Sequence, residues 1–91
     1  MSQISLSRDH TLGLDGAKQA IDQVGQDLAG KYGIDHRWKG NVMEVWGSGV
    51  IGTLKVTEET VQIDLSLGFL VAFLKESITG RINDELDSRL T

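Results

Sequence analysis

The sequence predicts an α+β protein with the element order β-α-β-β-β-β-α. It would fold as a two-layer sandwich, with both helices on one face of an antiparallel meander sheet. Three observations lead to this prediction. Apolar residues alternate with polar ones at residues 4–8, and they recur at helical spacing over residues 14–32 and again over residues 68–90. Between the two helices, apolar residues fit a single hairpin register, and the predicted strand order across the sheet is 2-3-4-5-1.

Length and composition indicate one domain, residues 1–91, because a chain of 91 residues has room for one hydrophobic core. The absence of cysteine excludes disulfides, cysteine nucleophiles and cysteine zinc sites. Nine Lys and Arg residues are scattered among 13 Asp and Glu residues, for a net charge of −4, which argues against a nucleic-acid partner. The N-terminus lacks the pattern of an export leader, so we expect a cytoplasmic protein.

The first strand and the first helix follow from side-chain periodicity. In "ISLSR", residues 4–8, Ile4 and Leu6 alternate with serines, which is typical of a strand with one buried face. The next stretch gathers its apolar residues on one helical face, and Gly33 follows where a helix C-terminus favours a left-handed residue. The apolar face comprises Leu14, Ala17, Ile21, Val24, Leu28 and Tyr32.

Three predicted turns, at Gly40-Asn41, Ser48-Gly49 and Glu58-Glu59, give the middle of the chain a testable register. The core-face pairs would be Trp38 with Met43, His36 with Val45, Met43 with Leu54, Val45 with Gly52, Leu54 with Ile63, Gly52 with Leu65 and Val56 with Val61. The outer-face pairs would be Arg37 with Glu44, Asp35 with Trp46, Glu44 with Thr53, Val42 with Lys55, Lys55 with Gln62 and Thr53 with Asp64. A slip of one residue would scramble the two faces, so the agreement of three turns supports this register.

The C-terminal stretch returns to helical spacing from Gly68 to about Leu90. Its predicted core stripe comprises Leu70, Val71, Leu74, Ile78, Ile82 and Leu86. If the first strand runs parallel to the strand after the first helix, it lies antiparallel to the last strand. Gly52, in mid-strand on the core face, is expected to let a helix approach the sheet closely.

The run "LSLGFLVAFL", residues 65–74, is the most apolar stretch of the chain, yet it is too short for a membrane span of about 20 residues. Phe69 and Phe73 lie roughly 140–180° from the centre of the predicted stripe, at about 100° per residue. Three interpretations are open. The first turn is not yet helical and both rings are buried, or the rings form a self-association surface, or they dock something apolar.

The outer sheet face carries a second apolar excess, with Trp46 opposite Ile51 and Val42 nearby. Neighbouring Arg and Lys stems could shelter these side chains. The other interpretation is that two apolar excesses on one small domain indicate an interaction protein. On that interpretation the candidate interaction surface comprises Phe69, Phe73, Trp46, Ile51 and Val42.

Patterns typical of catalysis are absent from the sequence. It contains no P-loop, no dinucleotide-binding glycine pattern and no nucleophile elbow, so we expect neither an enzyme nor a cofactor. The carboxylates and arginine near the C-terminus indicate a solvated helix end rather than an acid–base pair. These residues are Asp84, Glu85, Asp87 and Arg89.

Two Asp-His dipeptides, Asp9-His10 and Asp35-His36, contain residue types that bind metals. Parallel first and second strands would place them at opposite ends of the sheet, so we expect no shared metal site. His36 is expected to be a hydrogen-bonded core histidine, and His10 to belong to the turn or cap before the first helix.

Four segments carry a resemblance to a known family: "SRDHTLGLDGAKQAIDQVGQDLAGKYG", "RWKGN", "SGVIGTLKVTEETVQIDLSLGFL" and "LKESITGRINDELDSRL". In their order and full-length coverage the chain resembles the polyhydroxyalkanoic acid system protein family. These are small bacterial proteins encoded with polyhydroxyalkanoate synthesis and granule genes. The resemblance implies a cytoplasmic role near storage-polyester granules, and it carries over no catalytic residues.

Three functional hypotheses follow. The first is a non-enzymatic, granule-associated interaction domain, a homodimer, that binds the polymer, granule-coat proteins or itself; exposed Phe69, Phe73 or Trp46 would support it. The second is a binding domain for a small acyl or hydroxyacyl ligand, with an apolar pocket near Gly52, Trp38 and Leu70. The third is an enzyme with polar side chains clustered in a cleft, and it ranks last.

Overall fold

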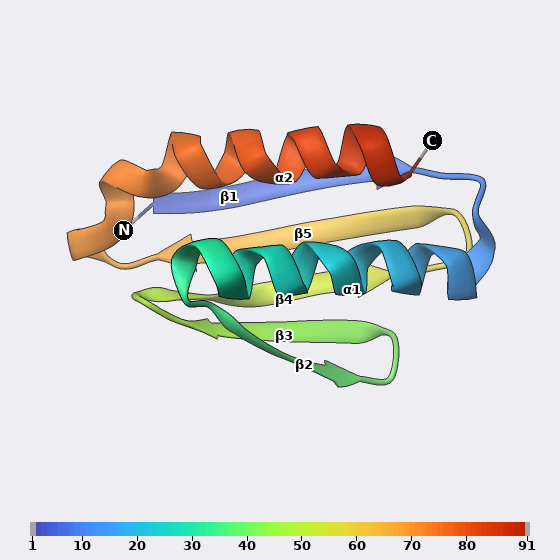
Figure 1. Ribbon diagram of the computed structural model, residues 1–91, viewed down its shortest axis with the longest axis horizontal. Coiled ribbons are helices and arrows are strands. Elements are labelled where there is room, and N and C mark those ends of the chain that lie inside the picture. Colours follow the sequence, from blue (N-terminus) through green and yellow to red (C-terminus); the bar gives the residue numbers. More distant parts are fainter. Residues whose placement is uncertain (1, 91) are drawn as a thin grey trace.

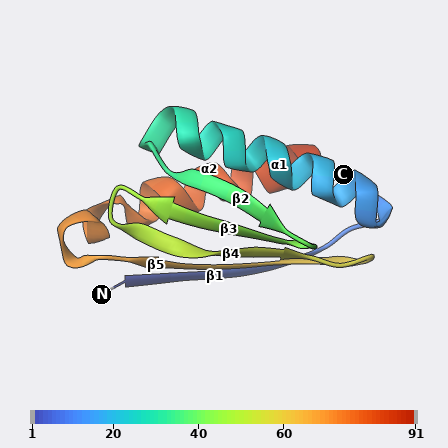
Figure 2. The ribbon, with the colours of Figure 1, turned by 90° about the horizontal axis from the view of Figure 1, so that it is seen from below.

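The computed structural model describes residues 2–90. Its elements are β1 (Ser2–Asp9), α1 (Gly13–Tyr32), β2 (Asp35–Lys39), β3 (Val42–Gly47), β4 (Val50–Val56), β5 (Thr60–Leu67), the 3-10 helix η1 (Phe69–Leu74) and α2 (Lys75–Arg89). The strands form one antiparallel sheet in the order β1-β5-β4-β3-β2, which confirms the predicted meander. Both helices cover one face of the sheet and leave the other face open (Figures 1 and 2).

The predicted register is confirmed in all three hairpins. Trp38 pairs with Met43, Met43 with Leu54 and Leu54 with Ile63, so their side chains lie on the helix-covered face. The turns fall where the sequence places them. Positive φ angles occur at Gly40, Ser48 and Gly49, the conformation that tight hairpin turns require.

The core lies between the sheet and the two helices. Its largest fully buried side chains include Ile21, Leu28, Met43, Leu54, Ile63 and Ile82. The helix α1 packs against β2 and β4, and α2 packs against β1. Gly25 allows the close approach of α1, because a Cβ there would lie only 2.8 Å from the Met43 Cε atom and 3.1 Å from the His36 ring.

Gly52 serves a different neighbour from the one expected. A Cβ on Gly52 would lie 2.2 Å from the Asp64 carbonyl oxygen and 2.8 Å from the Leu65 Cα atom, both in β5. The closest constraint on Gly52 is therefore the adjacent strand rather than the helix that the sequence led us to expect. Any side chain at this position would force β4 and β5 apart.

The predicted C-terminal helix is divided into two helices of different type. Residues 69–74 form a 3-10 turn, and the α-helix begins at Lys75. In α2 the predicted core stripe is confirmed, since Ile78, Ile82 and Leu86 are fully buried. No helix among residues 2–90 is both long enough and apolar enough to cross a membrane.

Candidate interaction surfaces

The short helix η1 exposes three large apolar side chains at one end of the molecule. Phe69 is 84% exposed, Leu70 81% and Phe73 80%. A 3-10 helix has about three residues per turn, so side chains at i and i+3 lie directly above one another. Leu70 therefore stacks with Phe73 on the outside, whereas Val71 and Leu74 stack on the inside and pack against the core. We call Phe69, Leu70 and Phe73 the η1 patch.

Backbone hydrogen bonds and one side-chain contact hold the segment that carries the η1 patch against the sheet. The Gly68 N–H donates to the Gly49 carbonyl at 2.8 Å, and the Val71 N–H donates to the Gly68 carbonyl at 3.1 Å. Val71 also packs directly onto the β3–β4 turn, because a Cβ on Gly49 would meet its Cγ2 atom at 2.8 Å. The exposed rings are thus carried by an ordered turn that is tied to the neighbouring hairpin.

These positions decide one of the three interpretations of residues 65–74. The first turn is indeed not α-helical, as one interpretation supposed, but Phe69 and Phe73 are exposed rather than buried. The prediction that Leu70 is a core residue is wrong, because its side chain is exposed. The assumed 100° per residue placed Leu70 beside Leu74, whereas 120° per residue places it beside Phe73.

The outer sheet face carries the second apolar group. Trp46 is 42% exposed and pairs with Ile51, which is 63% exposed, while Val42 is half-buried. The Arg37 guanidinium lies 5.8 Å from the Trp46 ring centroid and donates to Glu44 at 2.9 Å. That hydrogen bond lowers the pKa of Glu44 below its usual value.

Shallow hollows lie beside this outer group. One, of about 400 Å³, is lined by Glu44, Trp46, Ile51 and Thr53. Another, of about 280 Å³, lies between Ile51 and the polar side chains of β1 and β5. Arg37 covers part of Trp46, so this face is more sheltered and more polar than the η1 patch.

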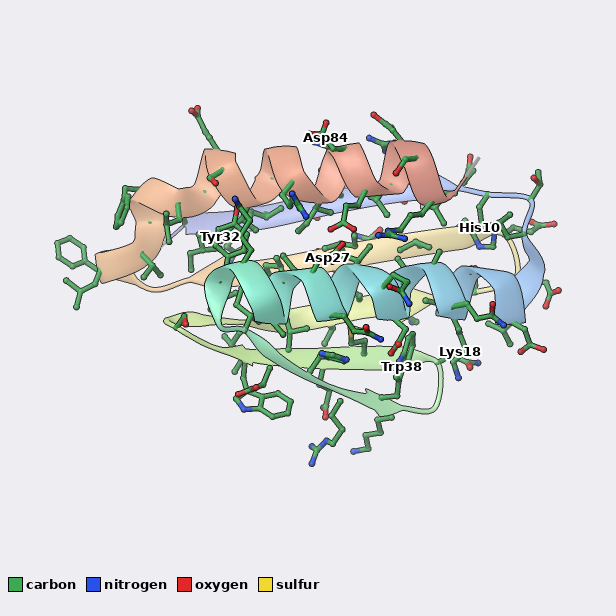
Figure 3. The ribbon with its side chains drawn as sticks, in the orientation of Figure 1. His10, Lys18, Asp27, Tyr32, Trp38 and Asp84 are labelled. Atoms are coloured by element: carbon green, nitrogen blue, oxygen red, sulfur yellow. The ribbon has the colours of Figure 1, made fainter. Side chains whose placement is uncertain are left out.

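The pocket expected for a small acyl ligand does not form around its three predicted residues. Gly52 lines the hollows on the outer face, and Leu70 projects from η1. Trp38 lies at the side of α1, where its Nε1 donates to Asp22 at 2.9 Å and the Lys18 ammonium lies 4.9 Å from its ring (Figure 3). The three residues therefore do not share one cavity.

The two histidines lie apart and have separate structural roles. The His10 Nδ1 atom accepts from the Leu12 N–H at 3.2 Å, and its Nε2 atom lies 3.1 Å from the Thr57 carbonyl (Figure 3). His10 therefore orders the turn before α1, as predicted. His36 is half-buried on β2, the opposite edge of the sheet, with its Nε2 atom 3.8 Å from Asp22. Within residues 2–90, no three His, Cys, Asp or Glu side chains come together as a metal site.

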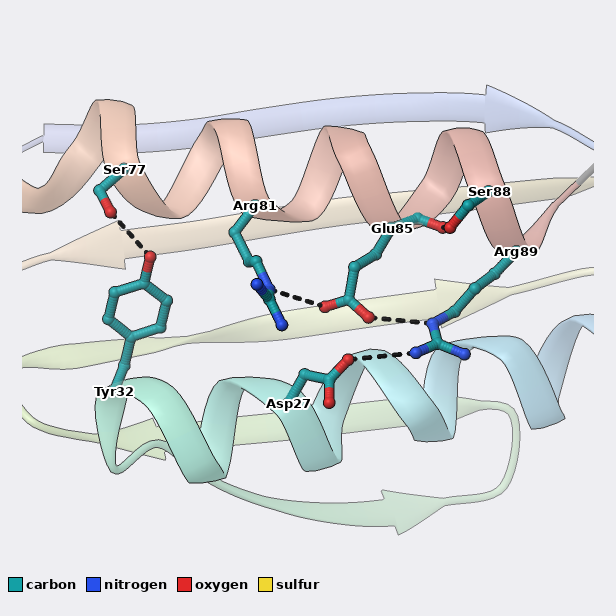
Figure 4. A network of polar contacts seen from close by, with 7 residues as sticks. All are labelled: Asp27, Tyr32, Ser77, Arg81, Glu85, Ser88 and Arg89. Atoms are coloured by element: carbon teal, nitrogen blue, oxygen red, sulfur yellow. Dashed lines mark hydrogen bonds and ion pairs between the residues drawn. The ribbon is translucent and has the colours of Figure 1, made fainter.

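A polar network that the sequence did not reveal joins the two helices (Figure 4). The Arg89 guanidinium donates to Glu85 at 2.9 Å and to Asp27 of α1 at 3.2 Å. Arg81 lies 3.6 Å from the second Glu85 oxygen, and the Tyr32 and Ser77 hydroxyls are 2.8 Å apart. Together these contacts hold α2 against α1.

The prediction of a solvated helix end is correct for Asp84 and Asp87, which are both exposed, and Figure 3 shows Asp84 pointing away from the sheet. Glu85 is buried, and Asp87 forms an ion pair with Arg8 of β1. Burial raises the pKa of Glu85 above its usual value, and the nearby Asp27 carboxylate raises it further. The interaction with Glu85 in turn lowers the pKa of Asp27, assisted by Arg89.

A family model described as "Putative polyhydroxyalkanoic acid system protein (PHA_gran_rgn)" matches residues 4–90 of this chain. The chain belongs to this family. The match includes residues of all five strands and of the helices α1, η1 and α2. Neither the curated proteins nor the solved structures contain a match to it.

Proposed function

We propose that this polyhydroxyalkanoic acid system protein is a non-enzymatic interaction domain that lies on the surface of storage-polyester granules in the cytoplasm. The η1 patch would contact the polymer itself. One observation carries this proposal: three large apolar side chains on consecutive turns of η1 are each at least 80% exposed. Exposed apolar groups on an ordered element are typical of a docking surface.

The chemistry of the patch suits a polyester surface, which offers alkyl groups and esters but no charge. Burying one Phe or Leu side chain contributes roughly 1.5–3 kcal/mol, so three contribute roughly 5–9 kcal/mol. Association itself costs an estimated ~4–15 kcal/mol. A single patch therefore predicts weak, reversible attachment, and the smooth apolar polymer requires no specific pocket.

The polar groups support a binding role over catalysis. His10 is engaged with the Leu12 and Thr57 backbone, and the buried carboxylate Glu85 is engaged with Arg89. General acid–base work needs a group that is free to reach a substrate. His10 and Glu85 therefore hold structural elements together.

The test is co-sedimentation of the purified protein with polyhydroxybutyrate particles. The wild type is compared with Phe69→Ser/Leu70→Ser/Phe73→Ser. We expect the wild type to pellet and the variant to remain in solution. The variant should change the free energy of unfolding by no more than about 0.5 kcal/mol, because these side chains are already in water.

The matched control is Trp46→Ser/Ile51→Ser, which removes apolar surface from the other exposed group. We expect this control to pellet like the wild type. Loss of pelleting in the control alone would move the polymer contact to the outer sheet face. A wild type that stays in solution would exclude direct polymer binding. The η1 patch would then bind either a granule-coat protein or a second copy of this chain.

A further inference from the structure

The two edges of the sheet differ in how well they are protected against pairing with another strand. The edge strand β2 has five residues, of which Asp35, Arg37 and Lys39 are charged. Short length and charged side chains are how natural proteins block edge-to-edge pairing. The other edge strand, β1, has eight residues, and its segment 2–7 is uncharged and free of proline. Only β1 is left as an open template.

One hydrogen bond fixes which backbone groups of β1 are free. The His10 N–H, just beyond the end of β1, donates to the Glu59 carbonyl of the β5 side at 2.8 Å. Backbone groups of alternate residues point the same way along a strand, so the even-numbered residues of β1 face β5. The odd-numbered residues Gln3, Ser5 and Ser7 then direct their N–H and C=O groups away from the sheet.

We propose that β1 pairs antiparallel with β1 of a second copy of this chain, about a two-fold axis at Ser5. This interface goes beyond the proposed granule role and does not depend on the η1 patch. In a two-fold pair, residues whose numbers sum to 10 lie opposite each other, so Ser5 faces Ser5 and Gln3 faces Ser7. These pairs supply six backbone hydrogen bonds.

Side-chain complementarity selects this register over its neighbours. Ile4 lies opposite Leu6 of the second copy, on the helix-covered face, where Leu6 is only partly buried in the single chain. A shift of the axis to residue 6 would place Ile4 opposite the charged Arg8, and a shift to residue 4 would place Leu6 opposite Ser2. The axis at Ser5 places both apolar side chains, Ile4 and Leu6, opposite apolar partners, whereas each shifted axis leaves one of them opposite a polar or charged residue.

Hydrogen exchange in the wild type tests the pairing directly. We expect the Ile4, Leu6 and Arg8 amides to be protected at every protein concentration, because they bond to β5. The Gln3, Ser5 and Ser7 amides should become protected only as concentration rises, together with a doubling of mass in sedimentation. Rapid exchange of the odd-numbered amides at all concentrations, with a constant monomer mass, would overturn the proposal.

Ser5→Pro tests the β1–β1 pairing by mutation, because proline removes an N–H that points away from the sheet and leaves the hydrogen bonds to β5 in place. We expect it to melt near the wild type and to stay monomeric. Ser5→Thr, which keeps the N–H and the hydroxyl that donates to Asp64, should still dimerise. A folded Ser5→Pro protein that dimerises like the wild type would contradict the β1 pairing.

Spin labels distinguish this interface from others, and the chain has no native cysteine to interfere. Labels on Ser5→Cys would lie on paired strands, with Cα atoms about 5.5 Å apart. Labels on Arg37→Cys would lie nine strand spacings apart, roughly 40 Å. Close Arg37→Cys labels would place the interface at β2, and loss of the dimer in the triple-serine η1 variant would place it at η1. Either result would overturn the proposal.

Discussion

The helices η1 and α2 follow each other without a break, yet the large apolar side chains of α2 are buried and most of those of η1 are exposed. In η1, Phe69, Leu70 and Phe73 point into solvent, and in α2, Ile78 and Ile82 are completely buried. Polar contacts differ as well, since α2 is tied to α1 through Arg89 and to β1 through Asp87. By contrast, η1 is held to the sheet by the hydrogen bond from the Gly68 N–H to the Gly49 carbonyl and by the packing of Val71 against Gly49.

This difference shows that exposure of the η1 patch is a product of helix type. Only the Val71–Leu74 row of a three-residue turn faces the core, so the other two rows are left outside. The segment stays ordered because that one row and the Gly49 contact hold it. Stability therefore resides in α2, while η1 carries apolar surface that folding does not use.

The largest expected effect on stability comes from α2. Ile82→Ala removes a fully buried side chain from the core, and we expect a loss of about 2–5 kcal/mol in the free energy of unfolding. Urea denaturation measures it. The matched control, Leu70→Ala in η1, should change stability by no more than about 0.5 kcal/mol. Similar losses in both variants would mean that Leu70 is packed, and the contrast between the helices would fail.

The next effect concerns the contact that holds η1. Gly49 has φ +82° and lies against Val71, so Gly49→Ala introduces both backbone strain and a clash. We expect a loss of about 1–3 kcal/mol and faster hydrogen exchange at the Val71 amide. Gly30→Ala in α1, where a Cβ meets open space, should instead stabilise the protein by about 0.5–1 kcal/mol. Unchanged exchange at Val71 in Gly49→Ala would show that this contact does not order η1.

The smallest effect is a pH dependence carried by Glu85. Because its pKa is raised from 4.5 in the folded state, this carboxyl favours folding at low pH, and that contribution is lost as pH rises through its folded pKa. Glu85→Gln keeps the shape but cannot ionise. We therefore expect the variant to gain stability relative to the wild type as pH increases from about 4 to about 7.

Thermal melts of both proteins across this range measure the difference. Asp27 has the opposite sign, because its pKa is lowered and its contribution is lost as pH falls through its folded pKa. A stability difference that is constant with pH would show that Glu85 does not titrate differently on folding.

The sheet could be predicted from the sequence because strand side chains alternate strictly between two faces. Each turn, such as Gly40-Asn41 or Ser48-Gly49, fixes both register and facing, so an error in one turn would contradict the next. The placement of β1 beside β5 depended on the assumption that β1 runs parallel to β2. The exposure of Phe69 and Phe73 was one of the open alternatives, and it depended on a boundary that periodicity could not locate.

The remaining features depend on information that a linear pattern does not contain. A six-residue segment is too short to separate a period of 3.0 from one of 3.6, so Leu70 was assigned to the wrong side. The Asp27–Glu85–Arg89 network needs the two helices to lie side by side, because Asp27 is 62 positions away from Arg89 in the chain. Gly52 was recognised as special, but the close approach of the Asp64 and Leu65 backbone to it could be found only from the structure.

The direction of β1 has a consequence for how two copies would work together. Ser2 lies opposite Leu67, immediately before η1, so the patch sits at the starting end of β1 (Figure 1). Antiparallel joining would send the two patches to opposite tips, each on a molecule 37 Å long. Such a pair would not attach to one granule through both η1 patches. It would act as a divalent cross-linker, able to hold two neighbouring granules together.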